Sequence, residues 1–304
     1  MDRQGTSSVR IGMVQPLTDL EDRKKNVENG VRYIEQAAAL GADIVCLPET
    51  YPGPWTPPID YDPLPSLRRA AEESGVYVIA GLIEAVPDQE TSYYNTFVLV
   101  DSEGGLAGRY RRTTPPGPWI YEGGSFWDFD WQETDELPVF DTPWAKIGIG
   151  MCSEVYFPEV SRILALQGAE IVFLPAGIPK PDLWHTWRTL IFARAIENLC
   201  ITATCQNVFE SSDLGNLGLT MVCSPEEVLL ESIREGVFVV ECDLERVRSL
   251  REQEDSLDVV ERRRCKPGIF KYWYRPELHG ERLAEVGRRM DRKKGTSYSN
   301  EEGA

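Results

Sequence analysis

Histidine is nearly missing from this chain, because only His185 and His279 occur among its 304 residues. Two imidazoles are too few for a histidine-rich metal site. The seven cysteines are odd in number and include no C-x-x-C pair, which argues against both a zinc site and a disulfide framework. We therefore expect no bound metal, and we expect most of the thiols to behave as small buried hydrophobes.

Long apolar runs and an excess of positive charge are also missing. No apolar run approaches the length of a membrane span, and the opening "MDRQGTSSVR" lacks the apolar core of a signal peptide. The chain has 49 acidic and 32 basic residues, a formal net charge of -17. This charge argues against partners such as nucleic acid or an anionic membrane surface. A cytoplasmic protein is the expectation.

What the chain does contain is an alternation of short apolar runs with amphipathic stretches. We expect a flexible N-terminus over residues 1–8, one domain over residues 9–272, and a C-terminal extension and tail over residues 273–304. The apolar runs predict strands over residues 9–16, 42–49, 76–86, 94–101, 106–112, 145–152, 169–176, 200–207, 218–224, 227–233 and 236–244. The amphipathic stretches predict helices over residues 19–40, 67–73, 157–167, 183–198 and 243–252.

An internal echo indicates how these elements are arranged. "AALGADIVCLPET" and "LALQGAEIVFLPAG" both pass from a helix end to Gly-Ala-acid-Ile-Val-x-Leu-Pro. This favours two related halves, each a sheet covered by helices on one face. Because fully apolar strands must be buried on both sides, the two sheets should pack face to face in a four-layer α-β-β-α sandwich. Glu49 and Cys152 then lie at strand ends, where open α/β sheets bind ligands.

Cys152 is a candidate nucleophile, and a cysteine needs a base or a positive neighbourhood to attack as thiolate. His185 is the only plausible imidazole partner, and Glu49 is the other candidate base. On the residues alone, Cys152 is as well explained by a structural role as by a nucleophilic one. The same holds for Glu49, which could cap a helix or lie as a satisfied acid at the surface.

Four stretches together resemble the carbon–nitrogen hydrolase (nitrilase) superfamily and its amidase-like branch. They are "LPET", "GRYRRTTPPG", "FDTPWAKIGIGMCSEVYFPEVSRILALQGAEIVFLPAG" and "ARAIEN", and the similarity runs from about Val9 to Tyr272. The resemblance implies the sandwich argued above and a Glu-Lys-Cys triad that needs no cofactor. That family hydrolyses non-peptide C–N bonds in amides and carbamoyl amines and, in one branch, nitriles.

Carried over by position, Cys152 resembles the nucleophile, Glu49 the general base, and Ser153 the residue whose backbone N–H supports the oxyanion. The departure is the lysine. The family pattern Tyr-Arg-Lys-x-His-Leu reads Tyr-Arg-Arg-Thr-Thr-Pro here, so that Arg112 takes the place of the catalytic lysine. Arginine keeps the charge but is longer and planar. It could be an oxyanion donor, an anchor for an anion, or a relic in a protein without activity.

Further residues are assigned by the same resemblance. Glu122 is the nearest candidate for a second family glutamate. Glu154 follows the nucleophile by two positions, as in the Cys-Trp-Glu of nitrilases, whereas the F-P-E that comes next resembles the amidase branch. Candidate substrate-binding residues are Tyr51, Trp119, Glu154, Tyr156, Trp184 and His185. On the residues alone, the aromatic side chains among them could line a pocket or pack in the core.

The leading hypothesis is a thiol-dependent hydrolase of a small non-peptide amide or N-carbamoyl compound. One alternative is a nitrilase that uses the same cysteine. The other is a non-catalytic member of the fold that binds a ligand or a partner, which the loss of the lysine favours. The resemblance also implies a homodimer or larger homo-oligomer, with an interface through residues 157–167 and "CKPGIFKYWYRPEL".

Overall fold

Two mixed sheets form the middle of the molecule. The computed structural model describes residues 6–20, 22–54, 59–89, 92–114, 130–177, 181–209, 217–253 and 265–289. The first sheet has the order β15 (Gly236–Asp243), β1 (Ser8–Gln15), β3 (Ile44–Cys46), β4 (Tyr77–Ala85), β5 (Ser92–Val100) and β6 (Leu106–Arg111), with β7 (Asp130–Trp131) paired to β5. The second has the order β14 (Val228–Ser232), β13 (Thr220–Cys223), β11 (Ile201–Thr204), β10 (Ile171–Phe173), β9 (Lys146–Ile149) and β8 (Val139–Asp141). A small ladder joins β2 (Leu17–Thr18) to β12 (Val208–Phe209).

The two sheets repeat one pattern of strand directions. In the first, β1, β3 and β4 are parallel, and β15 and β5 flank them antiparallel. In the second, β9, β10 and β11 are parallel, and β8 and β13 flank them antiparallel. The strands that carry the sequence echo, β3 and β10, occupy equivalent central positions. The prediction of two related halves is confirmed.

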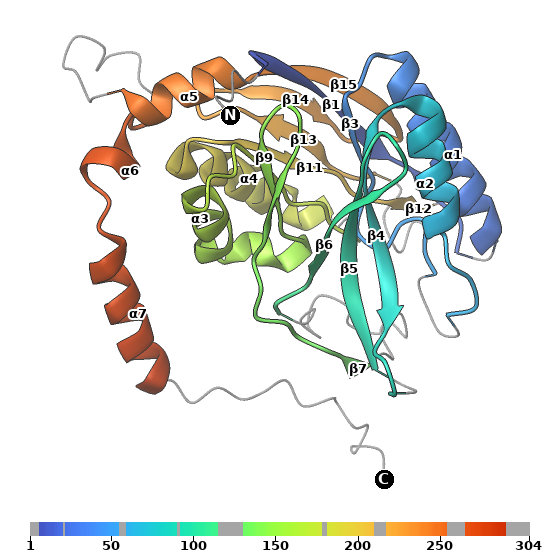
Figure 1. The fold of residues 1–304 in the computed structure, drawn as a ribbon, viewed down its shortest axis with the longest axis horizontal. Coiled ribbons are helices and arrows are strands. Elements are labelled where there is room, and N and C mark those ends of the chain that lie inside the picture. The colour runs from blue at the N-terminus through green and yellow to red at the C-terminus, as the bar shows by residue number, and fades with distance from the viewer. Residues whose placement is uncertain are drawn as a thin grey trace.

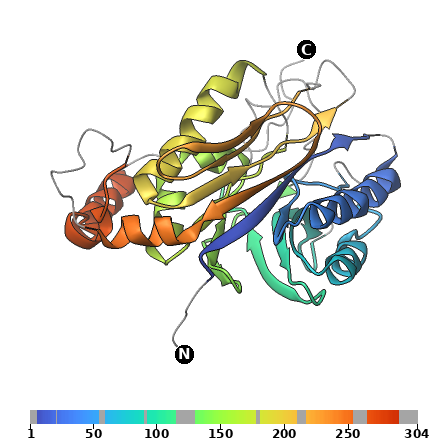
Figure 2. The same cartoon turned by 90° about the horizontal axis from the view of Figure 1, so that it is seen from above.

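Helices cover the outer faces of both sheets (Figures 1 and 2). α1 (Arg23–Ala39) and α2 (Leu64–Ser74) lie on the first sheet, and α3 (Pro158–Leu166) and α4 (Trp184–Asn198) lie on the second. Buried side chains form one cluster between the sheets, one under α1 and α2, and one under α3 and α4. The four-layer α-β-β-α sandwich is therefore confirmed. Removing these apolar faces from water is the main force that holds the layers together.

Helix boundaries follow the local signals of the chain. The Asp22 side chain accepts a hydrogen bond of 3.1 Å from Lys25 N and caps α1. α2 ends at Gly75, whose φ of +67° is the left-handed conformation that glycine adopts without strain. α3 begins at Pro158, which needs no hydrogen-bond partner for a backbone N–H in the first turn.

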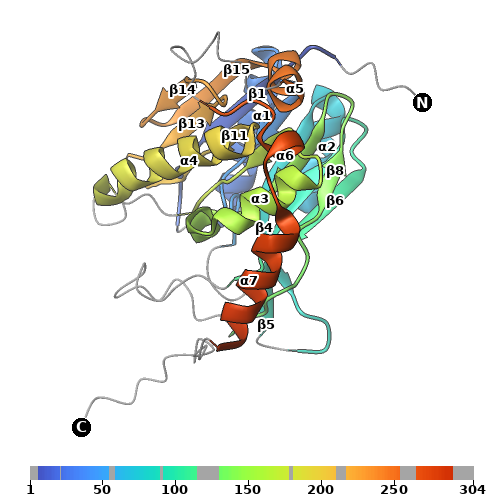
Figure 3. The ribbon, with the colours of Figure 1, turned by 90° about the vertical axis from the view of Figure 1, so that its left-hand side faces the viewer.

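The ends of the chain differ in part from expectation. Ser7 and Ser8 belong to the predicted flexible N-terminus, yet Ser7 O accepts bonds from Leu244 N and Glu245 N, and Ser8 opens β1. After α5 (Leu244–Glu252), the chain forms a short α6 (Ile269–Tyr272) and then α7 (Pro276–Arg289) within the predicted extension. α7 has no buried residue and stands away from the two-sheet body in Figure 1, and in Figure 3 it lies in front of that body.

In the part of the chain that the structure describes, no helix is both long and apolar enough to cross a membrane.

Candidate active site

Cys152 lies just beyond the carboxyl end of β9 and opens a 3₁₀ turn, Cys152–Tyr156. Its φ is +49°, a left-handed conformation that a residue with a side chain rarely adopts. Its backbone N donates to Pro175 O at 2.9 Å, which ties the turn to the end of β10. The residue is only 4% exposed. Backbone strain of this kind concentrates at functional sites, because the surrounding structure must hold it in place.

Glu49 follows β3 in the other sheet and is fully buried. Its Oε1 accepts hydrogen bonds from Asn95 Nδ2 at 2.7 Å and from Arg112 Nη1 at 2.9 Å. The turn can approach β4 closely because Gly81 has no side chain. A Cβ at that position would lie 2.3 Å from Thr50 N. The carboxylate is thus held in a fixed orientation by two donors and a close backbone contact.

Arg112 brings positive charge into this buried site. It follows the last residue of β6, and its side chain is 2% exposed. While Nη1 donates to Glu49, Nη2 donates to Ser153 Oγ, next to Cys152 in the turn. The three residues that sequence reasoning assigned to catalysis, Glu49, Arg112 and Cys152, therefore come together from three elements. Arg112 is therefore part of the buried site and is not exposed to solvent.

The thiol of Cys152 is protonated at neutral pH in this environment. Its pKa is raised to about 12, mainly by burial and then by the Glu49 carboxylate, which acts through its charge and through a side-chain hydrogen bond. The positive charge of Arg112 and a backbone hydrogen bond at Gly177 lower the pKa and offset part of this rise. Because the thiolate is scarce before substrate binds, attack requires a base that takes the proton as the bond forms. Glu49 is the neighbouring base.

Glu154, predicted to bind substrate, is a buried acid with several internal partners, and its contact with substrate stays a prediction. Its side chain is fully buried. Oε2 accepts from Tyr110 Oη at 2.6 Å and Met151 N at 2.8 Å, and Oε1 accepts from Thr113 N at 3.0 Å and Thr113 Oγ1 at 2.6 Å. Four donors occupy the carboxylate, so it joins the Cys152 turn to the segment that carries Arg112.

Tyr51 lies deep in the molecule. Its side chain is fully buried in the cluster under α1 and α2, and its hydroxyl donates to Asn26 O of α1 at 3.1 Å. It supports the turn that holds Glu49, and its contact with substrate stays a prediction.

The other candidate binding residues are placed as follows. Tyr156 is half-buried near the nucleophile, and burial followed by the charge of Cys152 raises its pKa. Trp184 packs against the same cluster as Cys152, whereas His185 is exposed in the first turn of α4. Contact of these three with substrate stays a prediction. Trp119 and Glu122 lie outside the described residues.

Sequence reasoning missed two asparagines that hold Glu49. Asn95 lies on β5 and donates to the carboxylate, and Asn207 Nδ2 donates to Glu49 O at 3.2 Å and to Gly177 O at 2.9 Å. The available signal was weak: each is a polar residue at one end of an apolar strand run, in "YYNTFVLV" and "CITATCQN". Their partners lie 46 and 158 residues away, a separation that no local pattern encodes.

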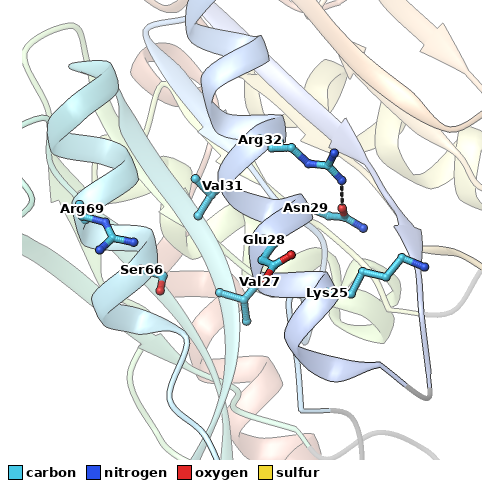
Figure 4. Close-up of a pocket in the computed structure, with 8 residues that line it drawn as sticks. All are labelled: Lys25, Val27, Glu28, Asn29, Val31, Arg32, Ser66 and Arg69. Atoms are coloured by element: carbon cyan, nitrogen blue, oxygen red, sulfur yellow. Dashed lines mark hydrogen bonds between the residues drawn. The ribbon is translucent and has the colours of Figure 1, made fainter.

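Two further features bear on ligands. Among the residues that the structure describes, no group of three or more His, Cys, Asp or Glu side chains could hold a metal ion. An open pocket of about 550 Å³ lies between α1 and α2, in the helix layer opposite to the one that covers Cys152 (Figure 4). Its lining includes Lys25, Asn29 and Arg69, and none of the catalytic candidates.

Known proteins are similar to this chain in sequence and in fold. A family model described as carbon-nitrogen hydrolase matches residues 10–252. Omega-amidase NIT2-B of Xenopus laevis is 27% identical over 279 residues, 84% of this chain and 98% of that protein. N-carbamoylputrescine amidase of Arabidopsis thaliana is 27% identical over 282 residues, 83% of this chain and 90% of that protein. A nitrilase of Pyrococcus abyssi is 29% identical over 273 residues, 84% of this chain and 97% of that protein.

A solved structure supports the fold. A mutant of the amidase from Nesterenkonia sp. AN1, whose active-site cysteine carries the acetamide moiety of fluoroacetamide, superposes with a TM-score of 0.68. The match covers 80% of this chain and 94% of that one at 21% identity. At this identity the likeness shows the shared fold.

Proposed function

The chain belongs to the carbon–nitrogen hydrolase family, and on that premise we propose that it hydrolyses a small non-peptide amide or N-carbamoyl compound with Cys152 as nucleophile. Membership makes it an enzyme for amide, carbamoyl or nitrile hydrolysis in general. The observation that supports the finer proposal is the convergence of Glu49, Arg112 and Cys152 in one buried cluster. The omega-amidase and N-carbamoylputrescine amidase relatives favour amide and carbamoyl substrates.

The first half of the reaction forms a thioester. Glu49 takes the proton from the Cys152 thiol while Sγ bonds to the carbonyl carbon of the substrate. The C–N bond then breaks, and the nitrogen leaves as ammonia or amine after it receives that proton from Glu49. The raised pKa of Cys152 fits this order, because the proton moves during the attack instead of before it.

The second half releases the acid. Water takes the place of the departed amine, Glu49 accepts one of its protons, and the oxygen bonds to the thioester carbon. The C–S bond breaks, and Glu49 returns the proton to the sulfur, so that the resting site is restored. Both halves place negative charge on the acyl oxygen. We assign its stabilisation to Ser153 N–H and to the Arg112 guanidinium, which lie beside the nucleophile.

A nitrile is the second candidate substrate. The nitrilase of Pyrococcus abyssi and the glutamate two positions after Cys152 favour it. The same thiol would add to the C≡N carbon to give a thioimidate, and two waters would be consumed in releasing ammonia and the acid.

We also infer that the enzyme acts as a homodimer or larger homo-oligomer. α3 exposes Ile163 and Leu166 by 41% and 43%, and Phe157, which precedes the helix, is 45% exposed. Arg162, on the same helix, lies 4.9 Å from the centre of the Phe270 ring and 5.2 Å from that of Tyr274. The two segments predicted to form an interface are therefore neighbours in one subunit. Together they offer the apolar and aromatic surface that interfaces favour.

The test of the proposed function compares wild type with Cys152→Ala on amides, N-carbamoyl amines and nitriles, with ammonia and acid both measured. Loss of the nucleophile should lower kcat/KM by roughly a thousandfold or more. Cys200→Ala is the matched control, because Cys200 is also a buried thiol with a raised pKa, of about 12, and lies in the same cluster. Turnover that does not depend on Cys152, or no turnover of any compound, contradicts the proposal.

A further inference from the structure

We propose that the Ser153 side chain is a positioning residue, which holds the Arg112 guanidinium in the orientation that the reaction needs. The inference rests on the proposed function and extends it to a hydroxyl that the family resemblance did not assign. The two residues come from different elements, since Arg112 follows β6 and Ser153 lies in the turn after β9. They meet through the hydrogen bond from Nη2 to Ser153 Oγ.

Both terminal nitrogens of the Arg112 guanidinium make hydrogen bonds. Nη1 donates to Glu49 and Nη2 donates to Ser153, while the Arg112 and Ser153 residues are 2% and 8% exposed. Because a guanidinium is planar, two hydrogen bonds in different directions define the plane of the group, and the loss of either one weakens that constraint. Ser153 is therefore one of the groups that set which N–H groups of Arg112 point toward the space above Cys152.

An arginine needs this second acceptor where a lysine does not. A lysine ammonium is a compact charge that can rotate its three donors toward Glu49. An arginine presents a second terminal nitrogen, and a buried donor without an acceptor is costly. Serine at position 153 meets the need, because it is small enough to leave room for the longer side chain and its oxygen accepts the bond. Arg112 and Ser153 form a matched pair.

The Ser153 side chain and backbone have different tasks. The hydroxyl oxygen accepts from Arg112 and sets the direction of the guanidinium. The backbone N–H, in the turn that Cys152 opens, is the group that donates to the acyl oxygen. The acyl oxygen would thus meet donors whose directions the Arg112–Ser153 pair has set.

The kinetic test is a double-mutant cycle. Ser153→Ala should lower kcat by roughly ten- to a hundredfold with little change in KM, since the guanidinium can turn away from the acyl oxygen. Ser153→Thr retains the hydroxyl and should recover most of that loss. In an Arg112→Lys background, Ser153→Ala should have an effect of about twofold or less, because its partner is already absent. Ser161→Ala, at a buried serine in α3 whose Oγ has no hydrogen-bond partner in the described chain, should leave the rate unchanged.

A second readout needs no substrate. The rate at which iodoacetamide alkylates Cys152, followed by mass spectrometry of its peptide from about pH 6 to 10, reports the charges around the sulfur. Ser153→Ala should shift this profile and Ser161→Ala should not. If wild type hydrolyses no test compound but Ser153→Ala shifts the profile, the proposed function fails and the positioning role stands. Equal turnover and equal profiles for wild type and Ser153→Ala overturn the inference, as do additive effects in the Arg112→Lys background.

Discussion

Arg112 Nη1 lies 2.9 Å from Glu49 Oε1, and this contact joins a buried cation to the buried base of the site. The Arg112 side chain is 2% exposed and the Glu49 side chain is fully buried, so water screens neither charge. Arg112, which stands at the position of the lysine in the family pattern, thus contacts the glutamate directly. Its longer, planar head adds the bond to Ser153.

Replacing Arg112 tests whether this contact matters for catalysis. Arg112→Ala should lower kcat/KM by roughly a hundredfold or more, since an oxyanion donor is lost. It should also lower the free energy of unfolding by about 3–5 kcal/mol, because Glu49 stays buried without its cation. Arg112→Lys keeps the charge but cannot contact Glu49 and Ser153 together, so we expect a loss of about tenfold and an altered substrate preference. Steady-state kinetics and denaturant unfolding measure these effects.

The control for Arg112 is Arg109→Ala, because Arg109 is an exposed arginine of β6, the strand that Arg112 follows, and pairs with Glu84 at 3.0 Å. Its rates should match those of wild type. Full activity in Arg112→Ala would show that the oxyanion assignment is wrong.

Glu154 should prove essential for stability. Glu154→Gln removes the charge and turns an amide NH₂ toward groups that are themselves donors, so we expect a loss of about 2–4 kcal/mol in unfolding free energy. Activity should fall with it, since the carboxylate ties Met151 to Thr113 on either side of the site. Urea titration measures the loss. Glu159→Gln, at an exposed glutamate in α3, is the control and should change stability by less than about 0.5 kcal/mol.

Stability should fall in alkaline solution. Burial raises the pKa of Cys152, Cys200, Cys223 and Cys242 from 9.0 to about 12. Below about pH 9 the folded and unfolded chains both hold these protons, so the four thiols add no pH dependence to the free energy of unfolding. Between about pH 9 and 12 the unfolded chain releases them while the folded chain keeps them, which favours unfolding. Each thiol then contributes a loss of up to about 1.4 kcal/mol per pH unit.

Thermal unfolding under reducing conditions from about pH 8 to 11 checks this expectation. Cys200→Ala should reduce the slope of unfolding free energy against pH by the contribution of one proton, about 1.4 kcal/mol per pH unit. A melting temperature that stays constant through about pH 10.5 would contradict it.

The exposed apolar face of α3 should mediate self-association. Ile163→Glu combined with Leu166→Glu places two charges on that face and should convert an oligomer to monomers, as measured by light scattering. Leu40→Glu is the matched control, because Leu40 is 59% exposed in the opposite helix layer and should leave the oligomer intact. A monomeric wild-type enzyme would rule out the assembly.

Local features of the sequence were enough to predict most of the fold. Apolar runs and amphipathic periods depend on neighbours a few residues apart, so β1, α3 and α4 were found at nearly their observed bounds. The short strand β8 was not predicted, and neither was α7, which lies in the predicted C-terminal extension. The positions of Glu49 and Cys152 at strand ends were also readable, because each follows directly on an apolar run.

By itself, the sequence determined the order of strands and helices, the two-fold echo, and the motif around Cys152. Only the tertiary structure decided what Arg112 and Glu154 contact. Arg112 reaches Glu49 across 63 residues of sequence, and Glu154 binds Tyr110 across 44. Such bonds form only after segments that are distant in sequence have packed together and water has left the space around them. A hydrogen-bond partner in a buried site is therefore a property of the packing, whereas a strand or a helix is already favoured by its own residues.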